Sequence, residues 1–167
     1  MSWSRRGLIG RGALAAGLLA LAACGFSPVY GPSGVGGKLF GQIRTADPVT
    51  PDEFTFAGRI AERLGPDQNA RFALAYKLRI AVVSQAITSD EVTTRYSLNG
   101  TADFVLTEEA SGQQVTRGQV STFTSYSTTG TTIATMSAEQ DAHDRLARML
   151  ADQVVTRLLA IDPATVE

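Results

Sequence analysis

The single histidine, His143, is the side chain best suited to act as a general base near neutral pH. Asp141 and Asp144 flank it, and such residues can orient a histidine in a Ser-His-Asp site. On a helix, however, facing side chains are three or four positions apart, so these aspartates do not point where His143 does. The spacing therefore favours a solvated histidine on a helix. The adjacent carboxylates Glu108 and Glu109 fall in a predicted turn, where they point to opposite sides and cannot easily share a proton.

The composition excludes several other classes of site. One histidine and one cysteine in 167 residues make a zinc enzyme improbable and exclude an internal disulfide. The glycine-rich run at 34–37 lacks the preceding strand and the lysine of a phosphate-binding loop, so no cofactor is expected. The 15 basic and 16 acidic residues nearly balance, which argues against a nucleic-acid partner. A hydrophobic fraction of 44% at this length is typical of one folded domain.

The only cysteine, Cys24, directly follows a segment typical of a bacterial export signal. Residues 1–23 contain three arginines and no acidic residue, and residues 12–23 are apolar throughout. Because about 20 apolar residues are needed to cross a bilayer, this segment predicts a signal peptide and not a membrane span. The arginine pair at 5–6 leaves two export routes open, general secretory and twin-arginine.

The residues before Cys24, Leu21-Ala22-Ala23, resemble a bacterial lipobox. That resemblance implies cleavage before Cys24, a diacylglyceryl thioether on its sulfur and an acyl chain on the freed amine. Stable anchoring takes more than one chain, so this modification would hold the protein at a membrane. Glycine at position 25, where sorting to the inner membrane would need aspartate, implies the outer membrane.

The mature chain is expected to begin with a short connector. Residues 24–37 are rich in glycine and proline and lack hydrophobic periodicity, so we predict a lipidated flexible tether. Residues 38–167 are expected to form a single α+β domain that opens with a strand at 38–45. Thr50, Pro51 and Glu53 then indicate a helix start with a capping box.

Three segments with alternating apolar residues, 72–82, 95–107 and 114–125, predict strands, and Ser111-Gly112 predicts a hairpin between the last two. Ser137 is expected to cap the last helix with Gln140 as its capping-box partner. Asp162-Pro163 is expected to end that helix. An apolar stripe runs along it, consisting of Ala142, Leu146, Met149, Leu150, Val154, Leu158 and Ile161. The expected order is β-α-β-β-β-α, a four-stranded, mainly antiparallel sheet with two helices packed on one face.

Taken together, the lipobox, the segment CGFSPVYG at 24–31, the three long polar-faced strands and the closing run at 138–147 resemble the LptE family of lipopolysaccharide-assembly lipoproteins. The resemblance covers the layout of nearly the whole mature chain. It implies two helices against a four-stranded sheet. It also implies an outer-membrane lipoprotein, not an enzyme, that plugs an LptD-type β-barrel, helps it assemble, and binds lipopolysaccharide.

A lipopolysaccharide-binding protein should offer cations to the phosphates of lipid A. The helix-free face of the sheet is expected to carry Lys77, Arg79, Asp103, Thr116 and Thr122. Candidate phosphate-binding residues on the strands are Lys77, Arg79, Arg95 and Arg117. The alternative is that these are solvated charges that discourage pairing between sheet edges.

Two other functional classes remain open. An auxiliary lipoprotein of an ABC-type lipid-trafficking system would also combine a lipobox with a small α+β body, but with an inner-membrane or periplasm-spanning partner. A lipid-anchored hydrolase would need a nucleophile motif beside His143, and the sequence offers none.

Overall fold

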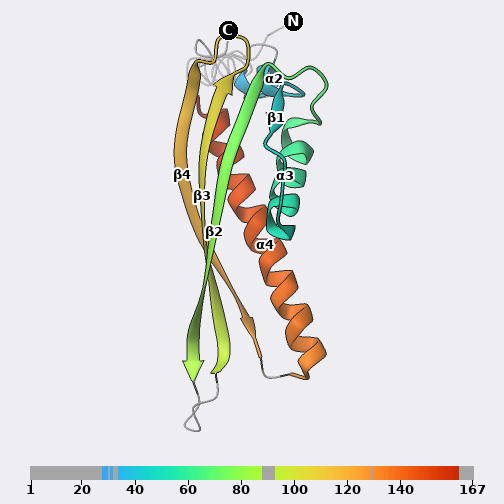
Figure 1. The fold of residues 1–167 in the computed structure, drawn as a ribbon, viewed down its shortest axis with the longest axis vertical. Helices are drawn as coiled ribbons and strands as arrows, with labels where there is room; N and C mark the ends of the chain where they lie inside the picture. Colours follow the sequence, from blue (N-terminus) through green and yellow to red (C-terminus); the bar gives the residue numbers. More distant parts are fainter. Residues whose placement is uncertain (1–27, 30, 32–33, 88–92, 129, 162–167) are drawn as a thin grey trace, which may run out of the picture.

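Two long helices and four strands follow one another in the predicted order (Figure 1). The computed structural model describes residues 28–29, 31, 34–87, 93–128 and 130–161. The expected signal peptide, Cys24 and the Asp162-Pro163 helix stop lie outside these residues.

The first long helix, α3 (Pro51–Leu64), begins as its sequence predicts. The Thr50 hydroxyl accepts a hydrogen bond from the Glu53 N–H at 3.3 Å, and the Glu53 carboxylate accepts one from the Thr50 N–H at 3.2 Å. This reciprocal capping box satisfies two backbone donors that a helix start leaves without partners. Phe56, Ile60 and Leu64 form the buried stripe of the helix, each 1% exposed or less.

The sheet contains β1 (Ile43–Thr45), β2 (Phe72–Ile87), β3 (Thr93–Glu108) and β4 (Gln114–Ser127), in that order across the sheet. The β2–β3 and β3–β4 pairs are antiparallel, and a turn at the predicted Ser111-Gly112 site joins β3 to β4. The β1–β2 pair is parallel, because the chain returns through α3 between these two strands. The mainly antiparallel sheet is therefore confirmed as a mixed sheet with one parallel pair, and both helices lie on the same face (Figure 1).

The last helix, α4 (Thr132–Leu159), begins six residues before the predicted start. Thr131, and not Ser137, is its cap: the Thr131 hydroxyl accepts a hydrogen bond from the Ala134 N–H at 3.3 Å. The predicted start was wrong because the residues before Ser137 do not continue the apolar stripe. Ile133 and Met136, which lie in this first part of α4, are 79% and 65% exposed. That stripe is otherwise confirmed, with Ala142, Leu146, Leu150, Val154 and Leu158 all 0% exposed.

A short helix, α2 (Val35–Leu39), occupies the end of the expected tether and the start of the expected first strand. Val35 and Leu39 are one helical turn apart and both are buried, which explains why this segment is helical instead of extended. The Gly36 N–H also donates to the Val29 carbonyl at 2.9 Å. The strand predicted at 38–45 is therefore limited to its last three residues.

One assignment of residues to sheet faces was wrong. Thr116 lies opposite Leu106 and Thr122 lies opposite Gly100, and both partners belong to the helix-covered face. The cause is a register shift near the hairpin, where Thr107 pairs with Gln114 but Leu106 pairs with Thr116. An extra residue in one strand moves every later side chain to the opposite face.

The sheet extends beyond the N-terminal end of α3, so helices cover the two ends of the sheet differently (Figure 1). We call the end that holds α2, β1 and α3 the proximal region. The distal region comprises residues 81–87, 93–98, 123–128 and 130–138. Five large exposed hydrophobic residues lie in the distal region: Val82, Val83, Phe123, Ile133 and Met136.

Candidate functional site

A charged cluster lies on the helix-free face of the sheet. Lys77 on β2 pairs in register with Asp103 on β3, which pairs in turn with Gln119 on β4. The Asp103 carboxylate accepts a hydrogen bond from the Gln119 amide at 2.6 Å and pairs with the Arg79 guanidinium at 2.6 Å. The Gln119 hydrogen bond, followed by Arg79 and Lys77, lowers the pKa of Asp103, so the cluster keeps this carboxylate charged.

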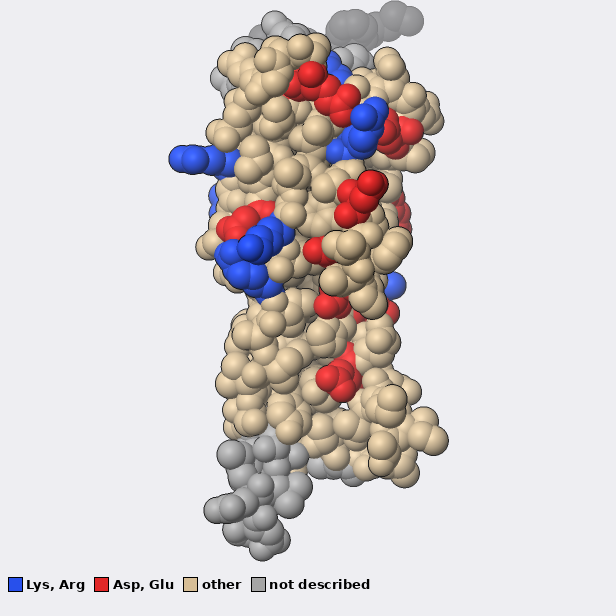
Figure 2. Space-filling model, viewed as in Figure 1, with Lys and Arg blue, Asp and Glu red and all other residues tan. Residues whose placement is uncertain are grey.

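The four predicted phosphate-binding cations are not equally placed. Arg117 lies two residues along β4 from Gln119, so it shares one part of the sheet with Lys77 and Arg79. Arg95 pairs with Ser127 at the distal end, roughly 20 Å along β3 from the residue that faces Arg79. Three of the four candidates are thus grouped. Figure 2 shows basic and acidic side chains meeting over the upper half of the molecule, while the lower half of this view is nearly free of basic ones.

The histidine has a partner that the sequence did not indicate. His143 Nδ1 lies 3.0 Å from an Asp52 carboxylate oxygen, and this contact joins α4 to α3. The expected freely solvated histidine is therefore wrong, since only a quarter of its side chain is exposed. The small groove beside it, about 270 Å³, is lined by Pro51, Asp52, Met136, Glu139, Gln140 and His143, none of which is a serine.

Two further contacts between α3 and α4 are polar. Asp152 on α4 accepts hydrogen bonds from Arg59 at 3.0 Å and from Arg63 at 2.6 Å. One to two turns earlier on each helix, the Thr55 hydroxyl donates to Asp144 at 3.1 Å. The sequence did contain a signal for these contacts between the helices, because polar residues recur at helical spacing on both segments. They are Asp52, Thr55, Arg59 and Arg63 on α3, and Asp144, Arg148 and Asp152 on α4.

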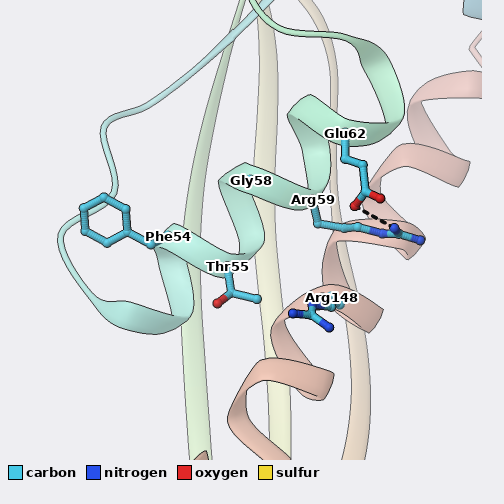
Figure 3. A pocket seen from close by; sticks show the side chains of 6 residues that line it. All are labelled: Phe54, Thr55, Gly58, Arg59, Glu62 and Arg148. Carbon is cyan, nitrogen blue, oxygen red and sulfur yellow. Dashed lines mark hydrogen bonds and ion pairs between the residues drawn. The ribbon is translucent and has the colours of Figure 1, made fainter. Parts of the chain in front are cut away.

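The outer surface of this helix pair carries a polar groove of about 480 Å³ (Figure 3). Phe54 and Gly58 line it from α3, and Gly58 leaves it open because nothing lies within 4 Å of where a Cβ would be. Arg59 is held by Glu62 at 2.8 Å, while Arg148 points into the groove from α4. Within the described part of the chain, Arg148 has no acidic partner, so it can pair with an incoming anion.

Metal-binding clusters and membrane-spanning helices were the two other features sought among the described residues. No group of three or more histidine, cysteine or acidic side chains there is arranged to hold a metal ion. None of the described helices is long and apolar enough to cross a membrane.

The fold and its surfaces define an α+β domain with two helices on one face of a mixed sheet and a polar second face. The family model for LptE, described as lipopolysaccharide-assembly, matches residues 41–158. The chain therefore belongs to the LptE family. No curated protein sequence matches it.

Several solved lipoprotein structures share this fold. A lipoprotein from Caulobacter crescentus CB15 is 20% identical and superimposes with a TM-score of 0.63, covering 75% of this chain and 92% of its own. Rare lipoprotein B from Shewanella oneidensis is 11% identical with a TM-score of 0.54, covering 70% and 91% of the two chains. A minor lipoprotein from Acinetobacter baumannii is 15% identical with a TM-score of 0.51, covering 71% and 89%. At these identities the likeness establishes the fold, and the predicted architecture is confirmed.

Proposed function

We propose that this protein is an outer-membrane lipoprotein, anchored by lipid on Cys24 at the periplasmic side. It binds lipopolysaccharide and plugs an LptD-type β-barrel, whose assembly it assists. Membership of the LptE family supports the assembly role. The structural observation that carries the proposal is the helix-free sheet face, where Lys77, Arg79 and Arg117 gather among polar side chains.

A plug inside a water-filled barrel needs polar outer faces and only enough core to fold. Here the apolar side chains of the sheet face α3 and α4, and the other face is free to contact a partner. The cations on that face differ in availability. Arg79 is engaged by Asp103, whereas Arg117 has no acidic partner among the described residues, so Arg117 is the more available of the two for an anionic ligand.

The partner is tested by co-expressing the full chain with the LptD-type barrel of the same cell and purifying the pair in detergent. We expect a stable complex, and we expect depletion of the lipoprotein to reduce lipopolysaccharide at the cell surface. A detergent-stable monomer, in cells whose lipopolysaccharide export survives its loss, would contradict the proposal. Recovery of an inner-membrane transporter instead would support the ABC-type alternative.

Lipopolysaccharide binding is tested separately on the purified lipoprotein. The variant with Lys77, Arg79, Arg95 and Arg117 all changed to alanine should bind lipopolysaccharide at least tenfold more weakly. Position is separated from charge by comparing two single variants, Arg117→Ala on the sheet face and Arg148→Ala on the helix side, because each removes one exposed cation. Equal weakening in these two single variants would show that the effect reflects charge and not the sheet face.

The anchor is tested by mass spectrometry of the protein purified from membranes. We expect an N-terminus at Cys24 with added diacylglycerol and acyl groups, and we expect Cys24→Ala to leave the membrane fraction. A native chain that keeps Met1 and a free thiol would contradict the anchor.

A further inference from the structure

Strand β4 forms an edge of the sheet, and its outer side pairs with no other described strand. The strand order places β3 on one side of β4 and no described strand on the other. At the opposite edge, by contrast, β1 covers the beginning of β2. An uncovered edge strand presents a row of backbone donors and acceptors that an added strand can bind.

The backbone groups that face outward can be identified. The Thr128 N–H donates to the Thr94 carbonyl across the β3–β4 pair. Because backbone groups alternate in direction along a strand, the even-numbered residues before Thr128 face β3 and the odd-numbered ones face away. The outward set is Arg117, Gln119, Ser121, Phe123 and Ser125. The Ser125 carbonyl fits this set, since it accepts a hydrogen bond from Arg145 at 3.3 Å.

This edge lacks the usual protection against pairing. Natural edge strands carry lysine, proline or several charges that block a second strand. Strand β4 has 14 residues, most of them hydroxyl-bearing, apolar or amide, and its single charged residue is Arg117. Phe123 in the middle of the outward set is 70% exposed.

A groove of about 460 Å³ lies along the proximal part of the same edge, between β4 and the end of α4. Arg117 lines it from β4 and Arg157 lines it from α4, and neither has an acidic partner in the described part of the chain. Gly118 lies two residues along β4 from Thr116, and the Phe104 ring, which also lines the groove, fills the place that a side chain would take there, 2.8 Å from a Cβ position. Two unpaired guanidinium groups in one groove favour a carboxylate.

We infer that the edge of β4 binds an extended segment of the barrel partner as an additional strand, with an acidic side chain of that segment in the groove between Arg117 and Arg157. This inference rests on the proposed function, which supplies the partner. Pairing of β4 with a second copy is disfavoured. An antiparallel, symmetric pair centred on Ser121 would bring Arg117 of one copy to Ser125 of the other, where Arg145 already lies.

Amide hydrogen exchange measures this edge directly in the complete complex. In the free lipoprotein the outward N–H groups of Arg117, Gln119, Ser121 and Phe123 should exchange quickly, because none of them has a partner among the described residues. In the complex with the barrel they should exchange at least tenfold more slowly. An intact complex in which these amides exchange as fast as in the free protein would overturn the inference and leave the proposed function standing. Failure to form any complex would instead count against the proposed function.

Substitutions provide a second measurement. Ser121→Pro removes one outward N–H and leaves the ladder with β3 in place, so it should weaken the complex at least tenfold. Ser121→Ala keeps that N–H and is the matched control, with an expected change below twofold. If Ser121→Pro does not fold, the exchange experiment on the unchanged chain still decides the question.

The acidic side chain is tested by Arg117→Gln combined with Arg157→Gln. We expect at least tenfold weaker binding at low salt and a smaller difference at high salt, because screening weakens the ion pairs of the unchanged protein. Unchanged affinity would overturn the acidic part of the inference. If the outward amides of β4 exchange more slowly as the concentration of the free lipoprotein rises, the strand pairs with a second copy of the chain. That result would overturn the entire inference.

Discussion

The proximal and distal regions use the same three strands but bury them to different extents. In the proximal region Phe72, Leu74 and Leu106 are at most 1% exposed, because α3 and the second half of α4 cover the sheet. In the distal region Leu98 on β3 is still 0% exposed, but Val82 on β2 is 52% exposed and Ile133 on α4 is 79% exposed. Since burial of apolar surface provides most of the stability of a domain, the proximal region stabilises the fold and the distal region is available for contacts.

The variant with the largest expected effect on stability is Leu150→Ala, in the buried stripe of α4. Leu150 is 0% exposed, and its side chain packs close to Gly100 of β3. Removing it should lower the free energy of unfolding by about 2–5 kcal/mol, as cavities in well-packed cores do. Urea unfolding followed by circular dichroism measures the change. A loss below 1 kcal/mol would show that the core is not concentrated here.

A smaller effect is expected at the polar contact between the helices. Asp152→Asn removes the charge that Arg59 and Arg63 share and should cost about 1 kcal/mol, because the groups are only partly buried. Glu62→Gln is the matched control: Glu62 pairs with the same Arg59 but is 67% exposed, so its loss should cost less. Equal losses in the two variants would argue that Asp152 has no special role in joining α3 to α4.

The charged cluster at Asp103 predicts a pH dependence. Its neighbours lower the pKa of Asp103 below the ordinary value of 3.8, so its contribution to stability is present above that pH. The contribution is lost as the pH falls through the lowered pKa. Asp103→Asn should therefore be less stable than the unchanged protein at pH 7, and the difference should disappear in acid. Urea unfolding between pH 7 and pH 2.5 would show a constant difference if this explanation is wrong.

The smallest effect on stability is expected in the distal region. Ile133→Ser should change the free energy of unfolding by less than about 0.5 kcal/mol, because the side chain is mostly in solvent already. If the distal surface meets a partner, the same change should still weaken the complex. A loss of stability comparable to that of Leu150→Ala would remove the distinction between the two regions.

The sequence predicted the local structure well where the signal itself is local. The Thr50–Glu53 capping box and the apolar stripe of α4 depend on residues within a few turns, and the structure confirms them. The hairpin at Ser111-Gly112 is confirmed for the same reason.

Features that depend on distant contacts or on exact register could not be predicted in this way. His143 meets Asp52 only because α3 and α4 pack together, 91 residues apart in the chain. The register shift near Leu106 has no clear sequence signature, yet it placed Thr116 and Thr122 on the wrong face. The start of α4 was missed because its first turn is exposed and therefore has no apolar pattern.

If Cys24 carries the proposed lipid, the packing of the chain at α2 limits how far the domain can lie from the membrane. The Pro28 carbonyl accepts a hydrogen bond from the Gly31 N–H, and the Val29 carbonyl accepts one from the Gly36 N–H of α2. The described chain is therefore tied to the proximal end from Pro28 and Val29 onward. Only four peptide units separate Cys24 from Pro28, a maximum reach of about 14 Å. A lipid carried by Cys24, as proposed, would therefore keep the proximal end within that reach of the bilayer surface, nearer to the attachment point than the distal end is.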